Sequence, residues 1–331
     1  MPETSDIIHV VLAVHDPKGT YSRHAGVVMA SIFENTKSRV LVHILHDDTL
    51  TAHNRSLLTE TASMYKQGVE FHDISSYMEQ MMNEDVQNAL GIWSVGTMFR
   101  LAIPDVISAD KVIYLDCDII VHMDIRELWD IPMGDFPIAG VRHDMVYKRF
   151  SASALRLRIM KFDAKDYLVA GLIVMNLSLI RAKYDMTRQI QPWYKRYGHY
   201  ARCPDQDFIN SYFSGKIKFL DRKFLATEPQ EGGVILHAVY KPWSEPIGCL
   251  MDRLYWETFL KTPWGMHLTP REVVNVMLDV IQGLPYRHLK TGNCYARILY
   301  RLRQDLFNSD VILIVKILWQ ELRHMLFHKE R

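Results

Sequence analysis

Two carboxylates separated by one residue are the strongest chemical feature of the sequence. Asp116 and Asp118 follow the apolar run Val112–Leu115, which has the composition of a buried strand. Side chains two residues apart in an extended segment face the same way, so the carboxylates should converge while Cys117 points back into the protein. Close carboxylates repel unless a cation neutralises them, and their hard oxygen atoms suit Mg²⁺ or Mn²⁺. A pair of solvated loop acids is the plainer alternative.

The segments around this pair predict a parallel sheet. Over about the first 75 residues, short apolar runs alternate with segments of helical period, a βαβαβ rhythm typical of α/β proteins. Ligands of such sheets bind outside the carboxyl ends of the strands, where the two aspartates should lie. No Gly-x-Gly-x-x-Gly motif follows the first strand, which disfavours a dinucleotide-binding Rossmann fold. We expect strands at 7–14, 40–45, 69–74, 111–121, 138–141, 168–176 and 234–237, and helices at 23–35, 52–66 and 95–107.

Composition and charge narrow the function classes. The 331 residues are 48% hydrophobic, enough for one large domain or for a main domain with an appendage. The net charge of +1 argues against nucleic acid as a partner. The four cysteines are widely spaced, which favours reduced thiols in the cytoplasm, and the sequence implies no metal site of zinc type. The first apolar stretch contains His9 and lacks a basic flank, so it predicts a strand and not a signal peptide.

The C-terminal segment differs from the rest of the chain. Between Arg287 and Arg331 it carries nine basic and four acidic residues, and helical spacing replaces strand signals beyond about Trp264. We expect a domain at 1–265 and a basic helical extension at 266–331. The apolar stripe that includes Trp319 fits a helix packed on the rest of the protein, or a helix lying on an anionic membrane surface. Its longest apolar run, Val311–Val315, is too short to span a bilayer.

The chain resembles the family 8 retaining glycosyltransferases, especially the bacterial lipopolysaccharide galactosyl- and glucosyltransferases. The resemblance extends from about Ile7 to Trp243, and it rests on the order and spacing of six short blocks, each weak alone. The blocks are Leu12-Ala-Val-His-Asp16 with Ala25 to Ile32; Phe99-Arg-Leu-Ala-Ile-Pro104; Tyr114-Leu-Asp-Cys-Asp118 running on to Leu128-Trp129; Ala170-Gly171 to Asn176-Leu177; Asp205-Gln-Asp207 to Asn210; and His237 followed by Lys241-Pro242-Trp243.

The resemblance implies a GT-A type nucleotide-sugar fold and a metal site. Asp116 and Asp118, completed by His237, would hold Mn²⁺ or Mg²⁺, and Lys241 would lie near the diphosphate of the sugar donor. Without the resemblance, a lone histidine at a strand end would read as an ordinary polar residue, and Lys241 as a surface lysine.

The resemblance also assigns residues to the nucleotide and its sugar. The first block, with Ala13, His15 and Asp16, corresponds to a stretch that grips uridine and ribose. Arg100 would contact the sugar and phosphates, and Asp144 would contact the sugar. Residue types alone would leave Arg100 as a structural ion-pair partner.

The Asp205-Gln-Asp207 block corresponds to residues beside the transferred sugar. Asp205 would help to bind the sugar, and the Gln206 amide would lie beneath the anomeric carbon. Residue types alone would make this block an acidic helix N-terminus.

The sequence departs from the family pattern at the expected site. Val169 stands where the family has asparagine, so one hydrogen bond to a substrate is absent. The segment from His237 to Lys241 is two residues shorter than the family's and lacks its glycine. His15-Asp16-Pro17 replaces a more acidic, amide-bearing stretch.

We therefore expect a retaining transferase that moves galactose or glucose from a UDP-sugar to a glycan or lipid-linked saccharide. Gln206 is neutral and a poor nucleophile, which favours front-face attack by the acceptor; double displacement would need a carboxylate such as Asp205 or Asp144. The alternative is a nucleotide-sugar binding protein with weak or lost activity, and a metal-dependent phosphatase is a weaker third. We expect a cytoplasmic protein, with a peripheral contact to the inner face of the membrane left open.

Overall fold

The computed structural model of the chain describes residues 7–143, 152–227, 233–237, 241–243 and 250–268. The predictions for Asp144 and for the basic C-terminal segment lie outside the described residues, and they stay predictions. Among the described residues, no helix has the length and apolar composition needed to cross a bilayer.

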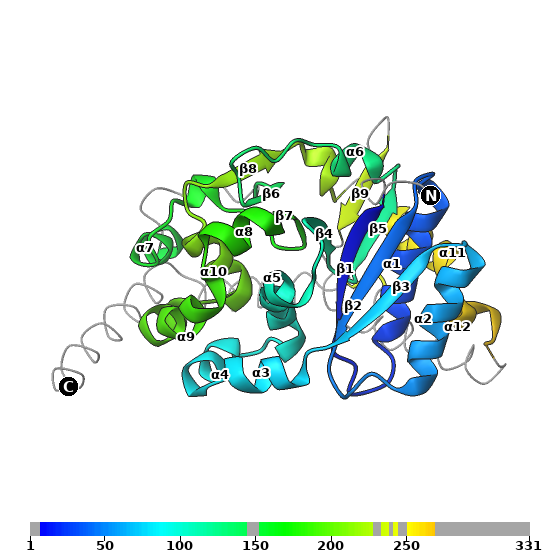
Figure 1. Cartoon of the computed structure of the whole chain (residues 1–331), viewed down its shortest axis with the longest axis horizontal. Helices are drawn as coiled ribbons and strands as arrows, with labels where there is room; N and C mark the ends of the chain where they lie inside the picture. Colours follow the sequence, from blue (N-terminus) through cyan, green and yellow to red (C-terminus); the bar gives the residue numbers. More distant parts are fainter. Residues whose placement is uncertain (1–6, 144–151, 228–232, 238–240, 244–249, 269–331) are drawn as a thin grey trace, which may run out of the picture.

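Strands form one central sheet and one small sheet (Figure 1). They are β1 (Ile8–Val14), β2 (Val40–His46), β3 (Gly68–Asp73), β4 (Lys111–Leu115), β5 (Ile119–His122), β6 (Ile138–Val141), β7 (Leu172–Asn176), β8 (Ile217–Leu220) and β9 (Val234–His237). The central order is β3-β2-β1-β4-β7-β6-β8, and only β7 runs antiparallel to its neighbours. The predicted α/β fold with a mostly parallel sheet is therefore confirmed. The small sheet pairs β5 with β9.

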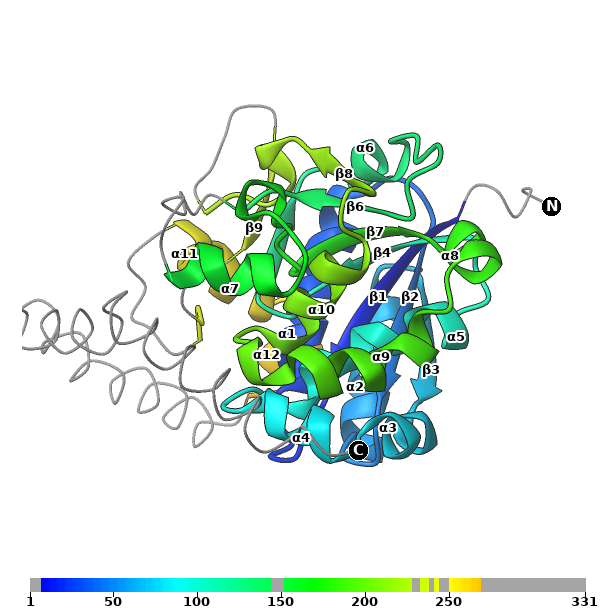
Figure 2. The same cartoon turned by 90° about the vertical axis from the view of Figure 1, so that its left-hand side faces the viewer.

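Helices cover both faces of the central sheet. They are α1 (Ser22–Asn35), α2 (Ala52–Met64), α3 (Ser75–Met81), α4 (Glu84–Leu90), α5 (Ile103–Val106), α6 (Arg126–Trp129), α7 (Ala152–Ile159), α8 (Leu177–Lys183), α9 (Met186–Tyr197), α10 (Pro204–Tyr212), α11 (Leu250–Phe259) and α12 (Pro263–Met266), with 3₁₀ turns η2 (Val95–Ala102), η3 (Ala164–Asp166), η4 (Gly198–Tyr200) and η5 (Arg222–Phe224). In Figure 1, α1, α2, α11 and α12 lie to the right of the sheet and α7 to α10 to its left. Figure 2 looks from that left side, so α7, α9 and α10 are in front.

The first strand separates two apolar cores. Ile8, Val10 and Leu12 pack against α1 and α2, whereas Val11 and Ala13 face η2, α9 and α10. Successive side chains of a strand point to opposite faces, so a strand covered on both sides needs apolar residues at nearly every position. Burial of both faces of β1 therefore explains why the run at 7–14 is almost entirely apolar.

Three predicted elements are shorter or divided in the structure. The predicted helix at 95–107 is the 3₁₀ turn η2 followed by α5, with Pro104, which cannot donate a backbone hydrogen bond, in the first turn of α5. The predicted strand at 111–121 is divided into β4 and β5 by a turn. The predicted strand at 168–176 becomes β7 only at Leu172, because the Ala170 N–H donates to the Gln206 side chain (2.8 Å) instead of a sheet neighbour.

A buried acid fixes the start of α10. Asp207 has no exposed surface, and its Oδ2 accepts hydrogen bonds from Arg156 Nη1 (2.7 Å) and from the backbone N–H groups of Arg202 and Cys203. Its Oδ1 accepts from the Tyr167 hydroxyl (2.8 Å). The helix that carries Asp205 and Gln206 is thereby held against α7 and the segment before β7.

We predict that Asp207→Ala lowers the free energy of unfolding by about 3–5 kcal/mol, because the Arg156 guanidinium stays buried without its carboxylate. Urea unfolding followed by circular dichroism measures the loss. Asp135→Ala, at an exposed loop position, is the control and should change stability by no more than about 0.5 kcal/mol. A loss below about 1 kcal/mol for Asp207→Ala would contradict the anchoring role.

Candidate functional site

A cleft of about 660 Å³ opens where β1 and β4 end. Its walls come from the loops after these strands, from η2, from the segment before β7, and from the starts of α10 and of the segment after β9. All the predicted site residues within the described part of the chain line this cleft: Ala13, His15, Asp16, Arg100, Asp116, Asp118, Asp205, Gln206, His237 and Lys241. The cleft lies at the carboxyl edge of the parallel strands, where ligands of such sheets bind.

The two aspartates converge with a histidine from a distant part of the chain. One ligand atom each from Asp116, Asp118 and His237 lies within 4.8 Å of the others. The carboxylates meet across a turn between β4 and β5 and not along an extended strand, while the Cys117 side chain turns inward and is 2% exposed. The pairing of Ile119 with His237 in the small sheet brings the histidine beside them.

A glycine leaves room for this group. The Gly171 carbonyl accepts the Asp116 backbone N–H (2.8 Å), so the two backbones lie side by side. A Cβ atom at Gly171 would lie 2.8 Å from His237 Cε1, 3.0 Å from His237 Nε2 and 3.3 Å from Asp116 Oδ2. Only a residue without a side chain fits here without displacing the histidine ring.

Two basic side chains face Asp118, which is 7% exposed. His237 Nε2 lies 3.3 Å from Oδ1, and the Lys241 ammonium contacts Oδ2. Burial alone would raise the pKa of this carboxyl, but the hydrogen bond from His237 and the charge of Lys241 outweigh burial and hold the pKa well below its usual range. Asp118 is therefore an anion across the physiological pH range, ready to bind a cation.

Arg100 links the second aspartate to α10. Its Nη2 donates to Asp116 Oδ1 (2.8 Å), its Nε lies 3.0 Å from Asp205 Oδ2, and its Nη1 donates to the Ala170 carbonyl (2.6 Å). Burial acts to lower the pKa of Arg100, but Asp116 and Asp205 outweigh it and raise the pKa. With its nitrogen atoms engaged inside the protein and only 5% of its surface exposed, Arg100 is placed to hold the carboxylates.

Burial, with a contribution from the charge of Asp116, raises the pKa of the Asp205 carboxyl to about 6, although the Arg100 guanidinium acts to lower it. Asp205 is 5% exposed in the wall of the cleft, and its carboxylate depends on Arg100, 3.0 Å away, for compensation.

Gln206 is held in one orientation. Its Oε1 accepts the Ala170 backbone N–H (2.8 Å), and its Nε2 donates to the Tyr167 hydroxyl (2.8 Å). Both polar atoms of the amide are thus used within the protein. The side chain can line a binding site at a fixed position, with the Tyr167 bond setting which end of the amide is nitrogen.

The first block is tied down by its own acid. The Asp16 carboxylate, 1% exposed, accepts hydrogen bonds from the backbone N–H groups of Tyr21 (2.6 Å) and Ser22 (3.0 Å) and from the Asn54 amide (3.1 Å). It therefore holds the loop after β1 against α2. His15, on the same loop, has its Nδ1 2.6 Å from Asp47 Oδ2 and is partly exposed in the cleft.

Several residues that support the site were not identified from the sequence. The Tyr114 hydroxyl donates to Asp116 Oδ1 (2.7 Å), and Trp243 stacks on His24 with ring centroids 3.5 Å apart. Tyr114 and Trp243 belong to blocks that carry the family resemblance, but no role in the site was inferred for either of them; Tyr114 is in β4 and Asp116 follows that strand directly. His24 lies within a helix and gave no signal, since only folding brings it beside Trp243.

The cleft offers ligand atoms for a divalent cation next to a positively charged side chain. Two carboxylates and one imidazole supply ligand atoms that suit Mn²⁺ or Mg²⁺, and Gly171 provides the space between them. Lys241, half exposed, adds a positive charge at the same place. A phosphorylated ligand would find a cation site and an ammonium on one wall.

Comparisons with known proteins identify relatives. A family model described as glycosyl transferase family 8 matches residues 14–232. Lipopolysaccharide 1,3-galactosyltransferase of Salmonella typhimurium is 30% identical over 139 residues, which cover 40% of this chain and 40% of that protein. General stress protein A of Bacillus subtilis is 24% identical over 209 residues, which cover 62% of this chain and 65% of that protein. The chain thus spans less than two thirds of the length of these curated relatives.

A solved structure shares the fold. A crystal structure of galactosyltransferase LgtC in complex with donor and acceptor sugar analogs matches with a TM-score of 0.66 at 20% identity, covering 81% of this chain and 100% of that chain. The fold of this chain is therefore the GT-A type that the sequence predicted.

We predict that Gly171→Ala weakens Mn²⁺ binding at least tenfold while the protein still folds, because the new methyl group can be accommodated by rotation of the His237 ring out of the cation site. Isothermal titration with Mn²⁺ and a thermal melt measure the two effects. Gly198→Ala is the control, since its Cβ would lie 3.3 Å from the nearest atom, away from the cleft. Unchanged Mn²⁺ affinity in Gly171→Ala would remove His237 from the ligand set.

Proposed function

Since the chain belongs to glycosyltransferase family 8, we propose that it is a retaining transferase that moves a hexose, galactose or glucose, from a UDP-sugar to a saccharide or lipid-linked saccharide acceptor. The observation that carries the proposal is the convergence of Asp116, Asp118 and His237 on the wall of the cleft. The named relatives support a sugar transfer, and the donor, the acceptor and the linkage are parts of the proposal.

Different residues of the cleft would bind the cation and the phosphate groups of a nucleotide diphosphate. Asp116, Asp118 and His237 would hold Mn²⁺ or Mg²⁺, which when bound stabilises negative charge on the departing diphosphate. Arg100 and the Tyr114 hydroxyl orient Asp116 through their hydrogen bonds to its Oδ1. Lys241 would turn from Asp118 to the phosphate oxygens and stabilise the charge that develops there.

The stereochemical proposal rests on how Gln206 and Asp205 are held. The Gln206 amide is neutral, which makes it a poor nucleophile, and its hydrogen bonds to Ala170 and Tyr167 fix its position. The second lone pair of Oε1 and the second N–H of Nε2 are what the amide has left to offer the sugar. Asp205 lies 3.0 Å from Arg100 and is 5% exposed, which leaves it poorly placed for covalent attack. Both features support attack by the acceptor hydroxyl from the face that UDP leaves, with the departing phosphate oxygen taking the proton.

The second candidate is a nucleotide-sugar binding protein with weak or lost transferase activity. The specific feature in its favour is Val169, which lines the cleft and whose apolar side chain offers no hydrogen bond there. Release of UDP from intact UDP-galactose or UDP-glucose in the presence of Mn²⁺ separates an enzyme from a binding protein.

Contact of the basic C-terminal segment with a membrane stays a prediction from sequence.

We predict that Asp118→Ala and Asp116→Ala each lower Mn²⁺-dependent UDP release by more than tenfold, a loss above about 1.4 kcal/mol in transition-state stabilisation, because each removes a metal ligand. The rate of UDP formation from a panel of UDP-sugars is the measurement. Asp135→Ala, which replaces an exposed aspartate outside the cleft, should keep the wild-type rate. Variants that retain more than a tenth of the wild-type rate would refute the metal assignment.

We predict that Lys241→Ala lowers the rate of UDP release about 100-fold without weakening Mn²⁺ binding. The ammonium contacts Asp118 Oδ2, so its removal leaves that oxygen free for the cation. Steady-state kinetics and Mn²⁺ titration on the same variant separate the two effects. Lys18→Ala is the matched control, because Lys18 is an exposed lysine that also lines the cleft. Equal losses in both variants would point to a general electrostatic effect of the cleft.

A further inference from the structure

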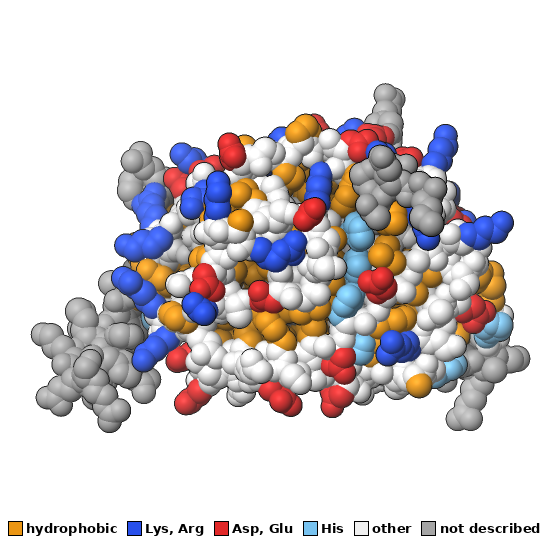
Figure 3. Space-filling model, in the orientation of Figure 1, with side chains coloured by type: hydrophobic (Ala, Val, Ile, Leu, Met, Phe, Trp, Pro, Cys, Tyr) orange, Lys and Arg blue, Asp and Glu red, His pale blue; other side chains and the backbone are white. Residues whose placement is uncertain are grey.

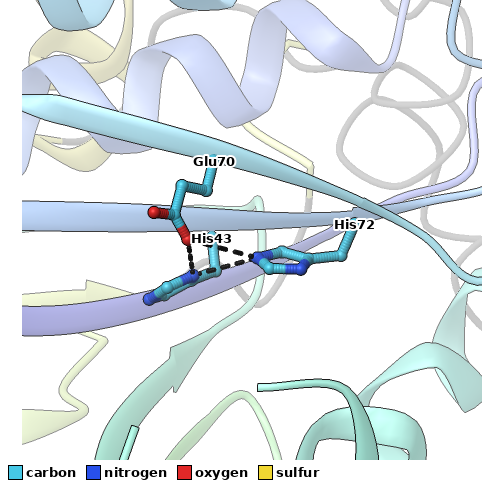
Figure 4. A group of neighbouring side chains, drawn as sticks. All are labelled: His43, Glu70 and His72. Carbon is cyan, nitrogen blue, oxygen red and sulfur yellow. Dashed lines mark hydrogen bonds and ion pairs between the residues drawn. The ribbon is translucent and has the colours of Figure 1, made fainter. Parts of the chain in front are cut away.

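A second group of metal-binding side chains lies on the central sheet, outside the cleft. His43 on β2 and Glu70 and His72 on β3 each direct a ligand atom to one point, and these atoms lie within 4.8 Å of one another (Figure 4). None of the three residues lines the cleft. Figure 3 shows histidine side chains gathered in a line on the face of the molecule seen in Figure 1, over the region of β1 to β3.

The pairing of the strands fixes this group. His43 is the register partner of Glu70 in the parallel pair β2–β3, so their side chains lie on the same face of the sheet. His72 follows Glu70 by two residues and therefore shares that face. The positions of all three Cα atoms are set by backbone hydrogen bonds of regular strands, which gives the group a rigid base.

The spacing of the ligand atoms suits a tetrahedral cation. His43 Nδ1 lies 3.0 Å from His72 Nε2 and 3.3 Å from Glu70 Oε2, and His72 Nε2 lies 3.8 Å from Glu70 Oε2. Ligand bonds of about 2.0–2.1 Å in tetrahedral geometry place ligand atoms about 3.3–3.4 Å apart. Shifts of less than about 0.5 Å in each contact would bring the three atoms to that geometry.

Of these three contacts, the one between His43 Nδ1 and His72 Nε2 is a hydrogen bond, which one proton between the two nitrogen atoms makes. The anionic Glu70 Oε2 lies beside this pair, 3.3 Å from one nitrogen and 3.8 Å from the other. A cation at the centre is attracted to all three atoms at once, and its charge offsets that of Glu70.

His9 on β1 contacts the ring nitrogen of His43 that faces away from the group. Its Nδ1 lies 2.9 Å from His43 Nε2, and the two rings stack with centroids 5.2 Å apart. A hydrogen bond on the far nitrogen orients a ligating histidine and fixes its tautomer. Burial lowers the pKa of His43 to about 3, with contributions from His9 and His72, so the ring is neutral. Glu70 is exposed, which leaves the outer side of the group open to water.

We propose that His43 Nδ1, Glu70 Oε2 and His72 Nε2 form a binding site for a borderline transition cation of the Zn²⁺ class, with water completing the coordination. Two imidazoles and one carboxylate favour such an ion over Mg²⁺ or Ca²⁺, whose ligands are mainly oxygen atoms. The bound ion joins β2 to β3, the strand at one edge of the sheet, and so stabilises that edge. The site is independent of the proposed transferase activity.

Isothermal titration of the full chain with Zn²⁺, with a thermal melt at each metal concentration, tests the proposal. The cleft also binds divalent cations under the proposed function, so the variants must separate two sites. His72→Ala removes one ligand, and Glu70→Gln keeps the shape of the side chain but removes its charge. Asp118→Ala disables the cleft instead. His53→Ala, at an exposed position of α2, controls for the loss of a surface histidine.

We expect Asp118→Ala to retain a Zn²⁺ equivalent that the Asp118→Ala/His72→Ala double variant lacks, and Glu70→Gln to weaken that equivalent at least tenfold. Zn²⁺ should raise the melting temperature of His53→Ala as much as that of the wild type, and of His72→Ala less. Equal Zn²⁺ stoichiometry and equal melting shifts in wild type, Glu70→Gln and His72→Ala would overturn the proposal. A thermal melt of each variant in the presence of a chelator shows whether the variant is folded without metal. If His72→Ala does not fold, Glu70→Gln, at an exposed position, still tests the proposal.

Discussion

The arrangement of the cleft depends on compensating three carboxylates in its wall, of which Asp118 and Asp205 are buried and Asp116 is partly exposed. Removing a carboxylate from water costs several kcal/mol unless a cation or several hydrogen bonds replace the solvent. Arg100 serves Asp116 and Asp205 together, and His237 and Lys241 serve Asp118. These contacts join η2, β4, α10 and the end of β9, elements that are far apart in the sequence. The cleft is therefore built as one electrostatic unit, and its parts cannot move independently without exposing a charge.

This constraint explains why residues expected to bind the sugar donor differ in their freedom to do so. Arg100 and Asp16 are buried, and their polar groups are engaged inside the protein, so they shape the cleft. Lys241 is half exposed and has one contact with Asp118, which a ligand carrying phosphate groups can replace. Under the proposed function, binding of a sugar nucleotide exchanges the partners of the exposed cation and leaves the buried ones in place. Substrate binding then costs little reorganisation, because the carboxylates are already oriented.

The sequence was most informative where function depends on neighbours along the chain. The Asp116 and Asp118 pair, the apolar strands and the parallel sheet follow from local spacing, and the family resemblance added His237 and Lys241. The space at Gly171 and the fixed amide of Gln206 depend on contacts between distant segments, which no local pattern records. Helices α8 and α9 were not predicted, although α9 places Ile190, Trp193 and Tyr194 on one buried face. Pro192 inside that helix obscured the pattern, since proline ordinarily ends a helix.

The two groups of metal-binding side chains differ in ways that should keep their cations apart. The group in the cleft has two carboxylates and one imidazole and lies in loops at the ends of strands, where ligands enter. The group on β2 and β3 has two imidazoles and one carboxylate and lies within regular strands. Carboxylate-rich sites suit Mg²⁺ and Mn²⁺, whereas imidazole binds Zn²⁺ well. Zn²⁺ binds most sites more tightly than Mn²⁺, so a stronger site on the sheet would take up Zn²⁺ at concentrations too low to fill the cleft. Separate affinities would let one chain use a hard cation for chemistry and a softer one for stability.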